Sequence, residues 1–272
     1  MNWFILALIL GAVEGLTEFL PVSSTGHLII AGEILGFHGE LASVFEVAIQ
    51  LGAILAVAVL YWRRFSGLAR GLWSWKVRPE EGLSGLRGLW LLFLTTLPPS
   101  VFGLLLHSRI KKLFSPETVA LALVAGALCM LLAEWLAPRR KERIPSLDAI
   151  TPGLALGIGF FQCLALWPGF SRSAATIMGG MLLGARRSVA AEYSFIAAVP
   201  LMLAATGYDV LKNLHSFSAQ DIPFFTAGFA FSFLFAWLAV KTFIALMGRL
   251  TLRPFAWYRL LIAPIVWYFL AR

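Results

Sequence analysis

The sequence predicts an all-α polytopic membrane protein, with six transmembrane helices and two re-entrant helical hairpins arranged as an inverted-topology repeat. Of the 272 residues, 60% are hydrophobic and only 13% are charged, and the mean hydropathy is +0.83. Soluble domains carry about 25% charged residues, so almost the whole chain is predicted to be membrane domain. Six apolar stretches are long enough to span a bilayer, and two more are interrupted by polar residues at their middle.

The six predicted spans are residues 43–61, 86–106, 118–136, 192–210, 224–246 and 257–271. A hydrocarbon core of about 30 Å requires about 20 residues of helix, and these stretches approach that length. The last one is short and relies on aromatic side chains at its interfaces, which are Trp257, Tyr258, Trp267 and Tyr268. No connection between spans is long enough for a soluble domain, so residues 1–272 are predicted to form a single membrane domain.

Two further regions, residues 3–36 and 152–184, are apolar but broken by proline, glycine and polar residues at 21–26 and 168–173. Each half of each region is too short to span a bilayer comfortably. Non-helical backbone at membrane depth is tolerated only where it is buried in protein or lines a cavity. We therefore expect two re-entrant hairpins, and the alternative is a pair of ordinary kinked spans.

The order of hairpin, three spans, hairpin and three spans predicts an internal repeat, about 1–136 and about 152–272. Pro21 lies 25 positions before Glu46, and Pro168 lies 24 positions before Glu192. Three crossings are an odd number, so the second copy is expected to be inverted. Short segments interrupted by glycine and proline at matching places in two halves indicate a binding site at the repeat interface.

The net charge of +8 comes from lysines and arginines in short loops that flank apolar segments. This distribution favours contact with anionic lipid headgroups and argues against nucleic acid. Most of these cations lie at residues 63–78, 139–143, 186–187 and 249–253, and fewer lie at 109–112, 212 and 272. The positive-inside rule puts the first group in the cytoplasm, so that both termini and the mouth of the first hairpin face outward.

The first interruption concentrates polar side chains between Glu14 and His27. Glu14 and Glu18 are four residues apart and share one helix face. Carboxylates this close repel, which favours either a shared proton, as in a general acid or base, or a bound cation such as Mg²⁺ or Ca²⁺. A structural pair held by hydrogen bonds is the alternative.

Three hydroxyl residues, Ser23, Ser24 and Thr25, precede Gly26 and a new apolar helix that begins near His27. One of them is expected to cap this helix, and a helix N-terminus with further hydroxyls is a ready site for an anion. Ser24 and His27 are three residues apart. This spacing is close enough for the imidazole to activate the hydroxyl, or for the histidine to attack phosphorus itself.

The second interruption contains Gly169 and Arg172. An arginine at membrane depth needs an anionic partner, and its forked guanidinium matches phosphate oxygens while glycine lets backbone amides approach closely. We expect the two tips to meet, with carboxylates and nucleophile from one and an anion clamp from the other. The alternative is a salt bridge from Arg172 to Glu14 or Glu18 that only holds the hairpins together.

Three polar residues near the ends of the spans that follow the hairpins, Glu46, Gln50 and Glu192, are weaker candidates. We expect them to support the tips through hydrogen bonds and not to react themselves.

The two interruptions resemble the motifs of the undecaprenyl-diphosphate phosphatase family, of the bacitracin-resistance type. The first motif reads Glu-Gly-Leu-Thr-Glu-Phe-Leu-Pro-Val-Ser-Ser-Thr-Gly-His at 14–27, and the second reads Pro-Gly-Phe-Ser-Arg-Ser at 168–173. The similarity extends through residues 45–52, 161–167 and 191–200 and covers most of the chain. Ala174 departs from the pattern, because the family commonly has glycine there, but its methyl group removes no functional group.

This resemblance implies a hydrolase of the bacterial inner membrane that converts undecaprenyl diphosphate to undecaprenyl phosphate and inorganic phosphate. Such an enzyme recycles the lipid carrier of peptidoglycan synthesis and confers bacitracin resistance. The resemblance also implies a divalent cation and an active site open to the periplasm. Carried onto matching positions, the site comprises Glu14, Glu18, Ser23, Ser24, Thr25, His27, Ser171, Arg172 and Ser173, with Gly26 and Gly169 beside them.

The nucleophile is left open among Ser24, His27 and water, with Ser24 favoured. The oligomeric state is also left open, with a homodimer as one option. A different class of function is compatible with the same residues, namely an inverted-repeat transporter or flippase for an anion or a lipid phosphate headgroup.

Overall fold

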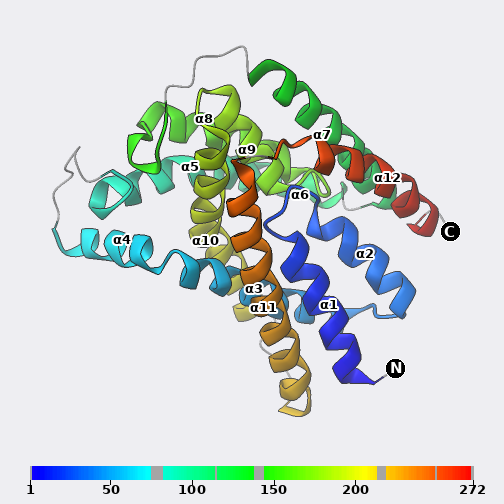
Figure 1. Ribbon diagram of the computed structural model, residues 1–272. Helices are drawn as coiled ribbons and strands as arrows, with labels where there is room; N and C mark the ends of the chain where they lie inside the picture. The colour runs from blue at the N-terminus through cyan, green and yellow to red at the C-terminus, as the bar shows by residue number, and fades with distance from the viewer. Residues whose placement is uncertain are drawn as a thin grey trace.

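The computed structural model describes residues 2–74, 82–113, 115–137, 144–212, 219–248 and 250–270. Within these ranges the regular elements are helices, and one isolated β-bridge joins Ile144 to Ala185 (Figure 1). Of the loop cations used above for orientation, those at 76–78, 139–143, 249 and 272 lie outside the described residues.

Five helices in the described part of the chain are long and apolar enough to cross a membrane. They are α3 (Glu40–Leu60), α5 (Gly85–Leu105), α7 (Pro116–Leu136), α10 (Arg187–Lys212) and α11 (Ile222–Met247). Each contains one of the predicted spans almost in full, so the chain is a multi-pass membrane protein. The predicted count of six is not confirmed. The sixth stretch is helical as α12 (Arg253–Leu270), but α12 is not among the five helices that are long and apolar enough to cross a membrane.

Both interrupted regions form pairs of short helices. The first pair is α1 (Trp3–Thr17) and α2 (Ser24–Leu35), and the second is α8 (Pro152–Gln162) and α9 (Arg172–Leu182) with the 3₁₀ turn η4 (Cys163–Leu166) between them. At 1.5 Å per residue these helices are about 16–23 Å long, which is shorter than the hydrocarbon core. The members of each pair contact each other, so both regions fold back as hairpins.

The hairpins are held by long helices from the opposite half of the chain. Helix α1 packs along α11, and α8 packs along α5, as the neighbouring ribbons in Figure 1 show. Glycines at the first contact allow close backbone approach, since a Cβ atom at Gly11 or Gly15 would lie 2.6 Å from the Gly228 carbonyl oxygen or 2.5 Å from that of Ser232. The largest buried apolar cluster includes much of α9 and α10. The second tip therefore lies against the largest buried cluster of the described residues.

Two helices lie where the sequence predicts only loops. Helix α4 (Trp62–Ser74) follows α3 and packs on α5, and the short α6 (His107–Lys111) follows α5. Helix α4 is amphipathic, because Leu68 is buried while Arg63 and Arg70 are exposed. The remaining elements are the 3₁₀ turns η3 (Leu147–Ala149) and η6 (Ala219–Asp221).

Asp148 in η3 connects three segments at the α4 end of the molecule. Its Oδ1 and Oδ2 accept hydrogen bonds from Arg64 Nη1 (2.6 Å) and Nη2 (3.2 Å), and Oδ1 also accepts from the backbone N–H of Leu83 (3.0 Å). The hydrogen bonds from Arg64 hold the pKa of Asp148 below its ordinary value.

We expect Asp148→Asn to lower the melting temperature in detergent at pH 7 by roughly 2–4 °C, since an exposed ion pair and one hydrogen bond together contribute about 1 kcal/mol. A carboxyl pKa that is lowered on folding stabilises the protein fully above the unfolded value of about 3.9, and this contribution is lost as the pH falls through the lower folded-state pKa. The difference between wild type and variant should therefore narrow below pH 4. A difference that stays constant at acidic pH would contradict this role of the carboxylate.

Candidate functional site

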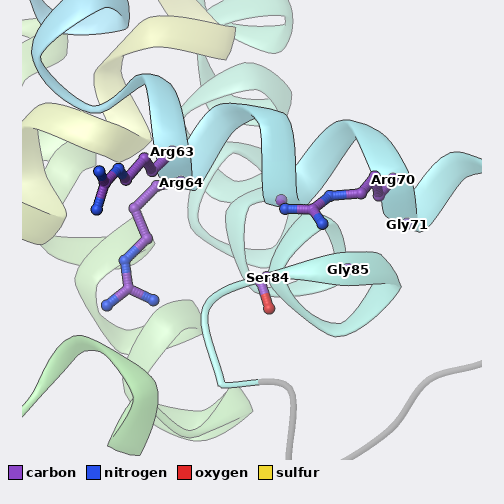
Figure 2. Close-up of a pocket in the computed structure, with 7 residues that line it drawn as sticks. Arg63, Arg64, Arg70, Gly71, Ser84 and Gly85 are labelled. Atoms are coloured by element: carbon purple, nitrogen blue, oxygen red, sulfur yellow. The ribbon is translucent and has the colours of Figure 1, made fainter.

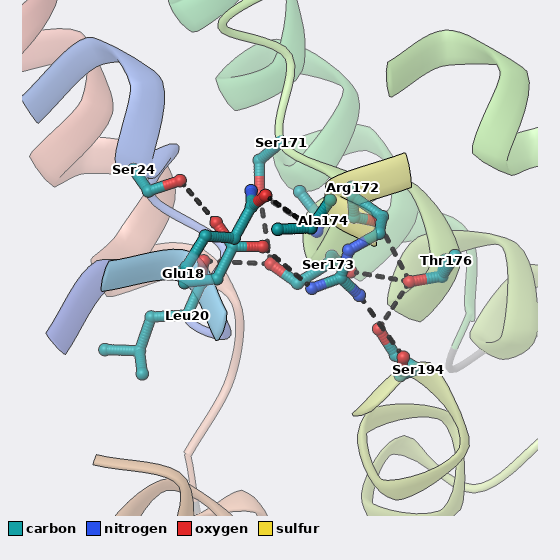
Figure 3. A network of polar contacts seen from close by, with 11 residues as sticks. Glu18, Leu20, Ser24, Ser171, Arg172, Ser173, Ala174, Thr176 and Ser194 are labelled. Atoms are coloured by element: carbon teal, nitrogen blue, oxygen red, sulfur yellow. Dashed lines mark hydrogen bonds and ion pairs between the residues drawn. The ribbon is translucent and has the colours of Figure 1, made fainter. Parts of the chain in front are cut away.

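The two hairpin tips meet inside the molecule (Figure 3). Arg172, the first residue of α9, donates a hydrogen bond from Nη2 to Glu18 Oε1 at 3.3 Å, and the Ser173 hydroxyl donates to the Leu20 carbonyl oxygen at 2.8 Å. The Arg172 and Glu18 side chains are only 13% and 10% exposed. An ion pair with so little exposure is weakly screened, so each partner strongly constrains the position of the other.

Each tip contains a serine with a strained backbone. Ser23 has a φ of 73° and Ser171 a φ of 76°, and in the described part of the chain no other residue except glycine has a positive φ. Both serines stand immediately before a helix and cap it, since Ser23 Oγ accepts from the Gly26 N–H and Ser171 Oγ accepts from the Ala174 N–H. Such strain costs about 1–3 kcal/mol and gathers at functional sites. The positive φ of each serine directs the N-terminus of the helix that follows, α2 or α9, toward a shared polar space.

The proton acceptor in contact with Ser24 is Glu18. Ser24 Oγ donates to Glu18 Oε2 at 2.5 Å, and the expected contact between Ser24 and His27 is replaced by it. Both nitrogens of His27 are engaged elsewhere, with Nδ1 at 2.7 Å from the Ser23 carbonyl oxygen and Nε2 at 2.7 Å from the Tyr258 hydroxyl. Because a carbonyl oxygen only accepts, a neutral His27 carries its proton on Nδ1 and accepts from Tyr258 at Nε2.

Arg172 is oriented by residues that sequence reasoning missed. Its Nη1 donates to the Ser194 carbonyl oxygen in α10 at 3.3 Å, and its Cζ lies 5.4 Å from the centre of the Phe19 ring. Thr176 hydrogen-bonds both the Arg172 carbonyl oxygen (2.9 Å) and the Ser194 hydroxyl (2.5 Å). Of the five N–H donors of the guanidinium, two have oxygen acceptors among the described residues. The other donors are left for a ligand.

A cavity of about 350 Å³ opens between the tips, which is a size typical of small-molecule sites. Its polar lining includes Glu18, Ser23, Ser24, Thr25, Gln50, Ser171 and Arg172, and Gly169 and Pro168 also contribute. Its apolar lining includes Ile110 of α6, Leu166 and Met202. A lining that contains both polar and apolar side chains suits a ligand with a charged head and an apolar chain.

The remaining predicted residues are distributed around this cavity. Glu14 is 2% exposed and is not in the cavity wall, although it lies within electrostatic range of Glu18, Glu46 and Arg172. Glu46 lines a separate cavity of about 290 Å³ between α2 and α3. Gln50 lines the tip cavity and accepts a hydrogen bond from Thr206 at 2.9 Å. Gly26 and Ser173 are buried beside the tips.

The third supporting candidate lies elsewhere. Glu192 interacts electrostatically with Tyr61 and Arg64, at the junction of α3 and α4. The residue of α10 that contacts the second tip is instead Ser194, two positions further on.

The donor set of the first tip is compatible with a divalent cation. Glu14 Oε2 is buried and has no hydrogen-bond partner among the described residues, whereas both oxygens of Glu18 are engaged by Arg172 and Ser24. The described residues contain no group of three or more His, Cys, Asp or Glu side chains arranged to hold a metal. Mg²⁺ binds through only one or two carboxylates when substrate phosphates and water complete its shell, and the pair of glutamates fits that mode.

Helix α12 contributes two further residues to the tips. Arg259 is fully buried, and its guanidinium donates to the carbonyl oxygens of Gly169 (3.0 Å), Phe170 (2.8 Å), Ala122 (3.1 Å) and Leu123 (3.2 Å). It therefore ties the second tip to α7, while the preceding residue Tyr258 holds His27 of the first hairpin. An arginine inside an apolar stretch is costly, so this signal was present in the sequence.

Known proteins resemble this chain over its full length. The family model described as bacitracin resistance protein BacA matches residues 7–265. The undecaprenyl-diphosphatase of Nitratidesulfovibrio vulgaris strain DP4 is 67% identical over 274 residues, which is 100% of both chains. Proteins with the same name from Desulfovibrio desulfuricans and Lawsonia intracellularis are 64% and 60% identical over 99% and 98% of both chains.

Proposed function

Because the chain belongs to the bacitracin resistance protein BacA family, we propose that it is an undecaprenyl-diphosphate phosphatase, which releases inorganic phosphate from undecaprenyl diphosphate. The observation that carries this function is the position of Glu18, which contacts the Ser24 hydroxyl with one oxygen and the Arg172 guanidinium with the other. A base, a nucleophile and an anion clamp are thereby joined at a cavity that has room for a diphosphate.

In the reaction we favour, the Ser24 oxygen attacks the terminal phosphorus while its proton passes to Glu18 Oε2. The bond from that phosphorus to the bridging oxygen breaks, and undecaprenyl monophosphate leaves. Water then hydrolyses the phosphoserine, which regenerates Ser24 and releases inorganic phosphate. Attack by His27 or directly by water is the alternative, but His27 is directed toward Tyr258.

Arg172 and the tip amides stabilise the charge that develops on the phosphate. The guanidinium is held in place by Glu18, Ser194 and Phe19, and its remaining donors match phosphate oxygens. The strained caps Ser23 and Ser171 direct the N-termini of α2 and α9 toward the same space. Preorganised donors of this kind are usually the largest contribution to phosphoryl transfer.

Glu14 and Glu18 are the residues that would hold a divalent cation, Mg²⁺ or Ca²⁺. When bound, such an ion supplies positive charge to the diphosphate oxygens. The buried oxygen of Glu14 without a hydrogen-bond partner supports this assignment.

We also propose the finer topology, with six transmembrane helices, two re-entrant hairpins and inverted repeats at about 1–136 and 152–272. Each hairpin packs on a long helix from the other half of the chain, α1 on α11 and α8 on α5, which supports this topology. The matching positive φ at Ser23 and Ser171 also supports it. The tip cavity borders α6 at the C-terminal end of α5, whereas the arginines of α4 lie at the other end. The positive-inside rule then favours a cavity open to the periplasm in a bacterial inner membrane.

The test is phosphate release from undecaprenyl diphosphate by detergent-purified protein. We expect release from the diphosphate but not from the monophosphate, and we expect EDTA to lower the rate by about tenfold or more, with Mg²⁺ or Ca²⁺ restoring it. If EDTA leaves the rate unchanged, the proposed dependence on a divalent cation is wrong, but the proposed hydrolase activity stands. No release from a folded sample would favour the transporter or flippase, for which flux into liposomes is the direct assay.

A further inference from the structure

A second polar cavity lies away from the tips, between α4 and the N-terminal end of α5 (Figure 2). Its volume is about 460 Å³, and it is lined by Arg63, Arg64, Gly67, Arg70, Gly71, Ser84 and Gly85. We call it the arginine groove. The five lining residues of α4 fall on one face of that helix, since their spacing follows the helical period. Neither the catalytic proposal nor the family resemblance uses these residues.

The glycines of the arginine groove allow α4 and α5 to pack closely. A Cβ atom at Gly71 would lie 2.2 Å from the Gly85 carbonyl carbon, so α4 and α5 are almost in backbone contact there. At Gly67 the nearest atom to such a Cβ would be Ser84 Cβ, at 3.4 Å. Because neither glycine carries a side chain, the side chains that line the groove are those of the three arginines and Ser84.

The arginine groove carries an excess of positive charge. Arg64 is paired with Asp148 and lies within electrostatic range of Glu192. Arg63 and Arg70 have no carboxylate partner among the described residues, and the one hydrogen bond described for the Arg70 guanidinium goes from Nε to the Ser66 carbonyl oxygen. Two guanidinium groups therefore remain available to an anion, and their fork geometry suits phosphate.

The position of the groove corresponds to the headgroup layer. Gly85 begins α5, and Ile110, which borders the tip cavity, follows its end. The 21 residues of α5 rise about 30 Å, which is the thickness of the hydrocarbon core. The arginine groove and the tip cavity thus lie toward opposite faces of the membrane. Basic amphipathic helices at the interface bind anionic lipids.

We propose that the arginine groove binds the phosphate group of an anionic phospholipid, through Arg63 and Arg70, with Arg64 held beside them by Asp148. A lipid is favoured over free phosphate because exposed apolar side chains precede the groove in the chain. Trp62, one residue before Arg63, is 68% exposed, and Val59, four residues before Arg63 on α3, is 48% exposed. These side chains offer a surface for an acyl chain next to the headgroup.

The test is a titration of detergent-purified protein with phosphatidylglycerol, phosphatidylcholine or inorganic phosphate, read by native mass spectrometry. Wild type should bind phosphatidylglycerol more tightly than phosphatidylcholine. The double variant Arg63→Gln/Arg70→Gln should lose about 30-fold in affinity for phosphatidylglycerol, as expected when two arginines near a lipid surface are removed. The matched control is Arg109→Gln/Arg253→Gln, which removes two exposed arginines outside the groove and should bind like wild type.

Equal loss in both double variants, or no loss in either, would overturn the proposal. Binding of inorganic phosphate at least as tight as that of phosphatidylglycerol, and lost in the groove variant, would overturn the lipid as the ligand and assign the site to a soluble anion. Melting temperatures in detergent without added lipid should be equal for wild type and both double variants. If the groove variant is less stable than wild type, Arg63→Lys/Arg70→Lys keeps both positive charges and should recover part of the affinity for phosphatidylglycerol.

Discussion

Arg172→Lys is expected to lower kcat/KM for undecaprenyl diphosphate by at least about 100-fold, although the positive charge is retained. The guanidinium contacts Glu18, the Ser194 carbonyl oxygen and the face of Phe19 at once, and it still has N–H donors for phosphate. An ammonium group is a single point of charge on a flexible stem and cannot make these contacts together. Initial rates of phosphate release across substrate concentrations measure the effect.

A matched control separates catalysis from stability. Arg187 forms a bidentate ion pair with Glu134, with distances of 3.0 and 2.8 Å, and Glu134 is buried. Arg187→Lys should lower the melting temperature but leave kcat/KM close to wild type. If Arg172→Lys behaves in the same way, with near-normal turnover, then the ion pair to Glu18 only holds the hairpins together and the clamp role is wrong.

The spans and the interruptions were predictable because each depends on local sequence. A run of about 20 apolar residues is typical of a membrane span, and proline and glycine clustered with polar residues at 21–26 and 168–173 favour a break in the helix. Helix α4 was not predictable in the same way. Its 13 residues include three arginines and two glycines, and it is helical because Leu68 packs into the core beside α5.

The sequence predicted which residues gather at the candidate site better than it predicted the hydrogen bonds between them. Spacing along a helix placed Ser24 beside His27, but the positive φ of Ser23 redirects the chain, and Ser24 meets Glu18 across the turn between α1 and α2. Equally, the position of Glu192 near the start of the span that follows the second hairpin predicts that it supports the tip, whereas the packing of α10 presents Ser194 to Arg172. Pairwise spacing describes regular helices, and the backbone of both tips is irregular, with a positive φ at Ser23 and Ser171.

Arg259 shows the opposite case, in which the sequence signal was available and its meaning depended on tertiary contacts. A buried arginine near the start of an apolar stretch requires acceptors, and here all four oxygen acceptors are backbone carbonyls from α7 and the second tip. Two of them, Gly169 and Phe170, lie within three residues of Arg172. We therefore expect Arg259 to be a positioning residue, which acts on the phosphate through the shape of the tip.

Arg259→Lys is accordingly expected to lower kcat by about 100-fold, because lysine cannot bridge four carbonyl oxygens and a displacement of about 1 Å at the tip is enough for such a loss. KM should change much less, since every group that lines the cavity is retained. Gly126→Ala offers an independent test, because its Cβ would lie 2.3 Å from Arg259 Nη2 and would displace the guanidinium without altering its charge. Gly207→Ala is the matched control, since nothing lies within 4 Å of a Cβ there.

The Arg259 and Gly126 variants should share one defect, so the double variant should be little worse than the more impaired single variant. A purely structural role makes a different prediction, namely a lower melting temperature with normal kcat in the protein that remains folded. Steady-state kinetics on samples matched for folded fraction distinguish the two. Normal kcat in Arg259→Lys, together with a lower melting temperature, would show that the buried arginine stabilises the packing of α12 on α7 and does not set the geometry of the tip.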